Sequence, residues 1–105
     1  MKYIMKIRIP QKRGNEALSD PQFGHKMNDL LAEIKAEAAY FTTIDGQRGA
    51  FVIINMNDAS EIPAIAEPFF LWLDADIEFY PLMRPEDLAK AGISIGAAVK
   101  KWGKH

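Results

Sequence analysis

Near the N-terminus, every second residue is apolar and the positions between are mostly basic. The alternating apolar residues are Tyr3, Met5, Ile7 and Ile9. A two-residue period predicts a β-strand with one buried face. Pro10 is expected to end this strand, and the polar stretch from residue 11 to residue 19 is expected to form a loop.

The next segment changes to the spacing of a helix. Asp20 and Pro21 predict its start, because aspartate accepts hydrogen bonds from the first free amides and proline needs no donor there. The apolar stripe that follows consists of Phe23, Met27, Leu30, Leu31 and Ile34. These positions predict a helix with one buried face that runs to about Glu37.

A hairpin follows this helix. Residues 39–44 are rich in β-branched and aromatic side chains, and residues 51–56 are almost entirely apolar, so both segments are predicted strands. Asp45 and Gly46 are expected to begin the connecting turn, because glycine provides the positive φ that such turns need. Gly49 is expected to close it.

A second helix is expected after the hairpin, capped by Asn57 or Asp58 and continuing to Leu73. Its inner side is predicted to consist of Ile62, Ile65, Ala66, Phe69, Phe70 and Leu73. Pro68 lies where a helix needs an amide donor. We therefore expect this helix to be kinked at Pro68 or split after Ala66.

Alternation returns in residues 75–82, which predict a fourth strand. Ile77 and Phe79 share one face of it, and the polar residues between them share the other. Pro85 is expected to open a short third helix that Gly92 ends. Residues 93–102 are expected to form a last helical or irregular piece.

The resulting element order is β-α-β-β-α-β with a helical C-terminal extension. This order predicts an α+β fold of the ferredoxin-like type, in which a four-stranded antiparallel sheet carries both helices on one face. The first strand is expected to lie between the third and the fourth. No repeat or linker interrupts the pattern, so residues 1–105 are predicted to form a single domain.

Helices on one face leave the other face of the sheet uncovered. On the third strand, Phe51 and Ile53 are predicted to point one way and Val52, Ile54 and Met56 the other, so both faces of this strand are apolar. One chain of this length has too few helices to cover both faces. We therefore expect a homodimer that forms through the open sheet face. The alternative is that residues 93–102 fold across that face.

Composition narrows the classes of partner. Hydrophobic residues make up 49% of the chain and charged residues 26%, which is typical of a globular protein. The formal charge of -1 and the scattered basic residues argue against nucleic-acid binding. No apolar segment is long enough to cross a membrane, and the chain has no cysteine, so we expect a cytoplasmic protein without disulfides.

The element order and several short motifs resemble the dimeric α/β-barrel superfamily. The motifs are AYF at 39–41, DGQRG at 45–49, DASEIP at 58–63, EPFF at 67–70 and PLM at 81–83. This superfamily includes muconolactone isomerase-like proteins and cofactor-free antibiotic-biosynthesis-type monooxygenases, and the motifs are similar to those of a bacterial branch of it. The resemblance implies a ferredoxin-like fold and a dimer. It implies no particular catalytic residue, because members use different pockets for different reactions.

A polar patch is expected on the open face of the sheet. Lys6 and Arg8 share a face of the first strand, and Glu78 and Tyr80 share a face of the fourth. If the two strands are neighbours, these side chains meet, with Arg8 able to bind a small carboxylate and Tyr80 able to donate to it. The alternative is cross-strand ion pairing that has only a structural role.

Other candidates for chemistry are more isolated. His25 is the only histidine within the body of the predicted fold and Glu67 precedes the predicted helix break, so each is a candidate acid or base. An exposed surface position is the alternative for His25, and capping of free amides is the alternative for Glu67. With so few histidines and no cysteine, we expect no metal site and no cofactor.

Arg48 and several aromatic residues are candidates for lining a pocket. Arg48 lies in the predicted hairpin turn, from which it can cover a cavity. The aromatic candidates are Tyr40, Phe41, Phe69, Phe70 and Trp72. Each of these residues has a plainer alternative, either as an exposed turn residue or as part of the core.

Two functions therefore stay open after the sequence is read. The first is a dimer that binds or transforms a small, partly apolar acid or ketone without a metal. The second is a non-catalytic dimeric module that regulates or assembles with another protein. No nucleotide-binding or serine-nucleophile motif is present, so the residues themselves assign no reaction.

Overall fold

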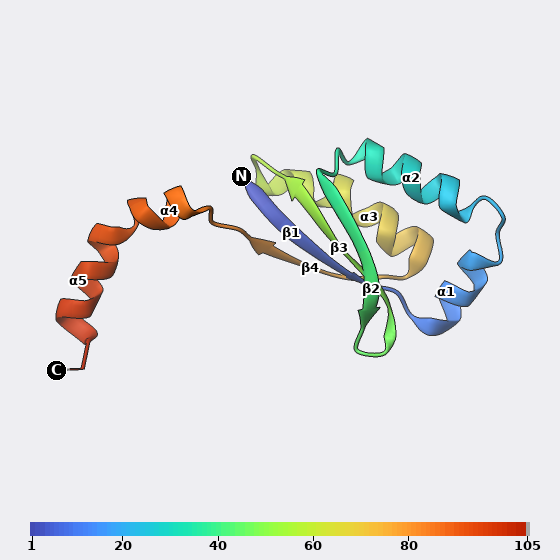
Figure 1. Ribbon diagram of the computed structural model, residues 1–105. Coiled ribbons are helices and arrows are strands. Elements are labelled where there is room, and N and C mark those ends of the chain that lie inside the picture. The colour runs from blue at the N-terminus through green and yellow to red at the C-terminus, as the bar shows by residue number, and fades with distance from the viewer. Residues whose placement is uncertain (105) are drawn as a thin grey trace.

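A computed structural model describes residues 1–104 as an α+β fold built on one sheet (Figure 1). The elements are β1 (Lys2–Arg8), α1 (Gln11–Leu18), α2 (Phe23–Glu33), β2 (Ala38–Ile44), β3 (Gln47–Asn55), the 3₁₀ turn η1 (Ala59–Glu61), α3 (Ile62–Leu73), β4 (Asp76–Pro81), α4 (Pro85–Lys90) and α5 (Gly92–Trp102). The four strands are antiparallel in the order β2-β3-β1-β4. This arrangement is compatible with a ferredoxin-like fold, and it confirms that the first strand lies between the third and the fourth.

The core lies between one face of the sheet and the helices α1, α2 and α3. The largest fully buried side chains are Phe69, Met5, Ile54, Leu73 and Val52. Val52 lies opposite Met5 in the β1–β3 register, so both point to the helices. Phe51 and Ile53 point to the other face and are only half-buried. The predicted division of β3 between two apolar faces is therefore confirmed.

The hairpin between β2 and β3 is tighter than expected. Asp45 and Gly46 have positive φ values of 51° and 79° and form a two-residue turn, which matches the right-handed twist of the strands. The sequence predicts that Gly49 closes the turn, but in the structure Gly49 lies within β3. A Cβ atom at Gly49 would lie 2.6 Å from Cδ1 of Ile44 and 2.7 Å from the carbonyl oxygen of Ile7. Glycine is therefore required there by the close approach of the neighbouring strands.

The expectation of a loop at residues 11–19 is wrong, because Gln11–Leu18 is helix α1. Its first turn closes when the amide of Gly14 donates to the carbonyl of Pro10. Gly14 and Ala17 form its buried side, and Arg13 Nε donates to the carbonyl of Trp72 at 2.8 Å. These tertiary contacts stabilise a short helix that its mostly polar sequence does not predict.

Helix α2 is shorter than predicted at both ends. The carboxylate of Asp20 accepts from the amide of Gln22 at 2.9 Å, but the residues before Phe23 form turns rather than helix. The helix ends at Glu33, and Lys35 has a positive φ of 56°. A left-handed residue ends a helix because it turns the backbone out of the helical path.

Helix α3 is continuous from Ile62 to Leu73, so of the two expected alternatives the split after Ala66 is wrong and the kink at Pro68 stays a prediction. Pro68 removes the hydrogen bond to the carbonyl of Ala64, but Ala64 is exposed and water can replace the lost donor. The predicted cap is present on the 3₁₀ turn that leads into α3. Asp58 accepts from the amide of Ser60, and Glu61 accepts from the amide of Asp58, each at 2.8 Å.

The chain leaves the body after β4 as a C-terminal arm, which we define as residues 83–104. Its helices α4 and α5 project from the end of β4 away from the sheet and the other helices (Figure 1). The molecule measures 59 × 28 × 21 Å as a result. Residues 93–102 are helical but do not fold across the open face of their own sheet, which stays uncovered.

Candidate functional site

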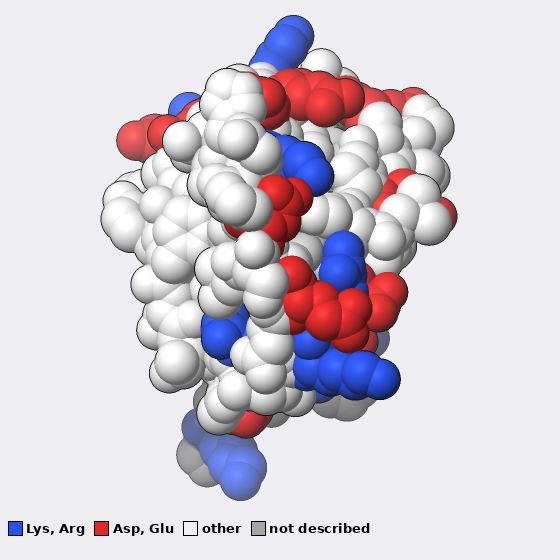
Figure 2. All heavy atoms as spheres, turned by 90° about the vertical axis from the view of Figure 1, so that its right-hand side faces the viewer, with Lys and Arg blue, Asp and Glu red and all other residues white. Residues whose placement is uncertain are grey.

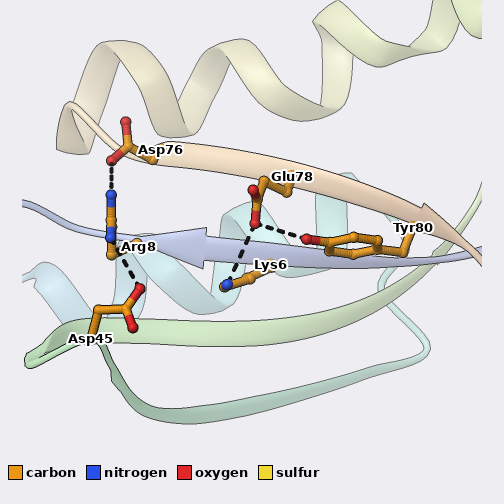
Figure 3. A network of polar contacts seen from close by, with 6 residues as sticks. All are labelled: Lys6, Arg8, Asp45, Asp76, Glu78 and Tyr80. Carbon is orange, nitrogen blue, oxygen red and sulfur yellow. Dashed lines mark hydrogen bonds and ion pairs between the residues drawn. The ribbon is translucent and has the colours of Figure 1, made fainter.

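The open sheet face carries the polar patch that the sequence predicts (Figure 3). Arg8 lies between two carboxylates, with Nη1 3.2 Å from Oδ2 of Asp45 and Nη2 3.0 Å from Oδ2 of Asp76. Asp76 is directly opposite Arg8 on β4, whereas Asp45 comes from the hairpin turn. The hydrogen bond from Arg8 to Asp76 raises the already high pKa of the guanidinium, which therefore stays charged.

The second half of the patch lies further along the same two strands. Lys6 is opposite Glu78, and Nζ lies 3.4 Å from Oε2. The hydroxyl of Tyr80 donates to the same Glu78 oxygen at 2.9 Å. The structure thus brings together all four residues that the sequence placed there, and each of them has a partner within the patch.

The balance of charge in this patch does not favour an anionic ligand. The hollow between the residues has a volume of about 290 Å³ and is lined by Lys6, Arg8, Asp45, Asp76 and Glu78. A small acid in it would meet three carboxylates and two cations, and both cations are already paired. Cross-strand ion pairing is therefore the role that this geometry supports.

The pairing of Tyr80 gives a first testable prediction. The hydrogen bond to Glu78 raises the pKa of Tyr80 above the ordinary tyrosine value of 10.0, and partial burial adds to the shift. Because the folded state favours the protonated phenol, the stability from this pair is present below pH 10 and is lost as the pH rises through the raised pKa.

When the folded protein is titrated, we expect the phenolate absorbance to contain a component from one tyrosine that ionises at a higher pH than an ordinary tyrosine. This component should be missing in Tyr80→Phe and should shift toward an ordinary pKa in Glu78→Ala, which removes the acceptor. An unchanged titration curve in Glu78→Ala would show that the hydrogen bond does not form in solution.

A second, apolar pocket lies on the helix side of the sheet. Its volume is about 220 Å³. Its lining residues are Ile7, Ile9, Leu18, Phe23, Met27, Leu31, Phe41, Thr42, Arg48, Gly49, Ala50, Val52 and Phe69. Among these, Arg48 brings a charged side chain to the helix side of the sheet, whereas Thr42 lies opposite Gly49, which lies opposite Arg8, so the Thr42 side chain points to the open face. The pocket is therefore a largely apolar space with a small number of polar groups, which is the usual composition of a small-molecule site.

Arg48 lies against helix α1. Its Nη1 atom donates to Oδ1 of Asn15 at 3.0 Å, and a Cβ atom at Gly14 would lie 2.9 Å from the same nitrogen. The small Gly14 thus leaves room for the guanidinium. Among residues 1–104, no carboxylate lies within ion-pair distance of Arg48. A positive charge without a counter-charge therefore lines an apolar pocket.

The other predicted site residues lie away from this pocket. His25 is exposed on α2, with Nε2 3.3 Å from Oδ2 of Asp29. Glu67 is exposed on α3, and Tyr80 lies on the opposite face of the sheet. The three candidate acids and bases are therefore not brought together. Tyr40 also points to the open face, whereas its neighbour Phe41 lines the pocket.

Sequence reasoning missed the residues that α1 brings to the pocket and to Arg48. Leu18 and Asn15 lie in the segment that is predicted to be a loop, whereas Phe41 of β2 is among the predicted lining residues. A signal was present in α1, where Gly14, Ala17 and Leu18 have the spacing of one helix face. Most of the other residues in that segment are polar, and for this reason the segment is predicted to be a loop.

Neither a candidate metal cluster nor a candidate membrane-spanning helix is found in the described part of the chain. Within residues 1–104, no group of three or more acidic, histidine or cysteine side chains is placed to hold a metal. No helix there is long and apolar enough to span a bilayer. On the face at the α1 and α2 end of the molecule, basic and acidic side chains are interspersed and form no large area of one sign (Figure 2).

Comparison with known proteins gives a similarity in structure only. No family model and no curated protein matches the chain. A solved structure that is similar is the "De novo designed protein Ferredog-Diesel", which is 15% identical, covers 77% of this chain and 85% of its own, and has a TM-score of 0.43.

Proposed function

We propose that this protein binds a small, partly apolar carboxylic acid in the pocket beside Arg48. The apolar part of the ligand would occupy the space between the sheet and α2, in contact with Met27, Val52 and Phe69. Its carboxylate would accept two hydrogen bonds from the guanidinium of Arg48.

The observation that carries this proposal is the uncompensated charge of Arg48. Arg48 is half-buried, with its aliphatic part against apolar surface, and a guanidinium without an acidic partner is free to bind a carboxylate through two hydrogen bonds. Arg8 on the other face of the sheet has two such partners, whereas Arg48 has only the neutral amide of Asn15. A carboxylate ligand would supply the missing counter-charge.

We further propose that the protein is a homodimer, of the dimeric α/β-barrel type, in which the open sheet faces pack together. The uncovered face includes Ile4, Phe51 and Ile53, and burial of this apolar surface favours association. The ion pairs of Arg8 and Lys6 would lie at the interface, where they would help to set the register of the two sheets.

The acid-binding proposal is tested by titrating the protein with benzoate and with benzamide, its neutral counterpart, while NMR chemical shifts are followed. We expect benzoate to shift the signals of pocket residues and to bind more tightly than benzamide. Arg48→Gln should weaken benzoate binding by roughly 10- to 100-fold, because it removes a charge-assisted hydrogen bond.

Two variants control this experiment. Arg8→Gln removes the same charge from the other face of the sheet and should leave benzoate binding unchanged. Asn15→Ala should keep most of the binding, because it removes only the neutral partner of Arg48. If Arg8→Gln weakened binding and Arg48→Gln did not, the acid would bind on the open face. If neither probe bound, the non-catalytic module would become the better interpretation.

A further inference from the structure

The C-terminal arm exposes an apolar stripe that nothing in its own body covers. On α5, Ile95, Val99 and Trp102 recur at intervals of four and three residues, so they share one side of the helix. Trp102 is 76% exposed. A helix with an apolar stripe of this length is not stable alone in water and normally packs against another surface.

The two edges of the sheet differ in their protection. The β4 edge carries Asp76, Glu78 and a proline, residues that discourage pairing with another chain. The β2 edge, Ala38–Ile44, has neither charge nor proline. Its aromatic side chains Tyr40 and Phe41 are 66% and 61% exposed. The β2 edge is therefore the edge of the sheet that can accept contact with another chain.

Electrostatics favours another copy of this chain as the partner. The arm holds five of the thirteen basic residues but only two of the fourteen acidic ones. Its formal charge is therefore +3, and the formal charge of residues 1–82 is −4. An arm of one copy is attracted to the body of another, because complementary charges steer association.

Topology determines which part of a second copy the arm meets. The arm starts at β4, and its own β2 is the opposite edge of the sheet. A two-fold axis parallel to the strands, between two open faces, reverses the strand order of the second sheet. It therefore sets β4 of one copy against β2 of the other. The arm then begins beside the edge strand that lacks protection.

We propose that the arm of each copy crosses the β2 edge of a second copy and lays its apolar stripe against Phe41 and the rim of the pocket. The inference rests on the proposed dimer and adds to it the residues that complete each site. Helix α5 has 11 residues and is about 16 Å long at 1.5 Å per residue. Its length is therefore sufficient to cover Phe41 and Leu18, which lines the same pocket. The proposed contact requires the arm to turn back after β4, from the direction seen in Figure 1, toward the β2 edge of the second copy.

Cross-linking tests this contact directly, because the chain has no native cysteine. Val99→Cys and Phe41→Cys are purified separately, one of them isotopically labelled, then mixed and treated with a short bismaleimide. We expect a mixed, cross-linked pair that mass spectrometry identifies. Val99→Cys mixed with Glu67→Cys, on the exposed side of α3, is the matched control and should give little mixed product.

Dimer affinity gives an independent measurement. Val99→Asp places a charge in the stripe and should raise the dissociation constant of the dimer about tenfold or more, as expected from loss of one buried valine. Ile93→Asp makes the same change on the opposite side of α5 and should alter it less than about twofold. Light scattering over a range of protein concentrations provides both values.

The possible outcomes distinguish failure of the proposed arm contact from failure of the proposed dimer. A stable dimer that shows no Val99–Phe41 cross-link, and that responds equally to both aspartates, overturns the arm contact and leaves the proposed dimer intact. A monomer at all concentrations overturns both. A cross-link that forms only within one chain of the Phe41→Cys/Val99→Cys double variant shows that the arm covers its own pocket, which also overturns the proposal.

Discussion

Replacing Phe69 by alanine should lower the free energy of unfolding by about 3–5 kcal/mol, the largest effect we expect from any single substitution. Phe69 is 0% exposed and is the largest fully buried side chain. It fills the space between α3 and the centre of the sheet, and it also lines the pocket beside Arg48. The truncation therefore removes apolar contacts and leaves a cavity continuous with the pocket.

Phe70→Ala is the matched control for this prediction. Phe70 is the next residue on the same helix, but it is 40% exposed, so the same truncation should cost much less. Urea denaturation at a fixed protein concentration measures both variants. Equal losses for the two would mean that α3 does not pack on the sheet through the side that holds Phe69.

Gly49→Ala should destabilise the protein by about 3 kcal/mol, the upper end of the usual cost of overpacking. The new Cβ atom would press on Cδ1 of Ile44 and on the carbonyl oxygen of Ile7. A side chain can rotate away, but the Ile7 carbonyl belongs to the central strand β1 and cannot move without disturbing its ladder. Thermal or urea unfolding of the variant measures the cost.

Gly24→Ala tests whether that cost is specific to the position. A Cβ atom at Gly24 has no neighbour within 4 Å, and the residue is part of helix α2. This control should leave the stability unchanged or raise it by less than about 1 kcal/mol, because alanine restricts the unfolded chain. A Gly49→Ala variant as stable as its Gly24→Ala counterpart would show that β1 and β3 are further apart than described.

The sheet could be predicted because its information is local. The alternation in β1, the apolar run of β3 and the Asp45–Gly46 turn each specify backbone conformation within a few residues. The element order then leaves few ways to pair the strands. The same alternation placed Lys6 and Glu78 on one face before their contact was known.

The pocket could not be predicted in the same way because its parts are joined only by tertiary contacts. Helix α1 is stabilised by the hydrogen bond that Arg13 donates to the carbonyl of Trp72, and these two residues are far apart in the sequence. Arg48 was recognised as a candidate, but its position against Asn15 depends on that same helix. That Pro68 does not split α3 could not be predicted either, because the exposure of Ala64 depends on tertiary structure.

Because the arm and the body have opposite formal charges, a single copy of the protein has a dipole moment. The positive arm and the negative body lie at opposite ends of a molecule 59 Å long. A two-fold axis cancels only the dipole components perpendicular to it, and components along the axis add. The attraction between the arm of one copy and the body of another is electrostatic, so added salt should weaken it.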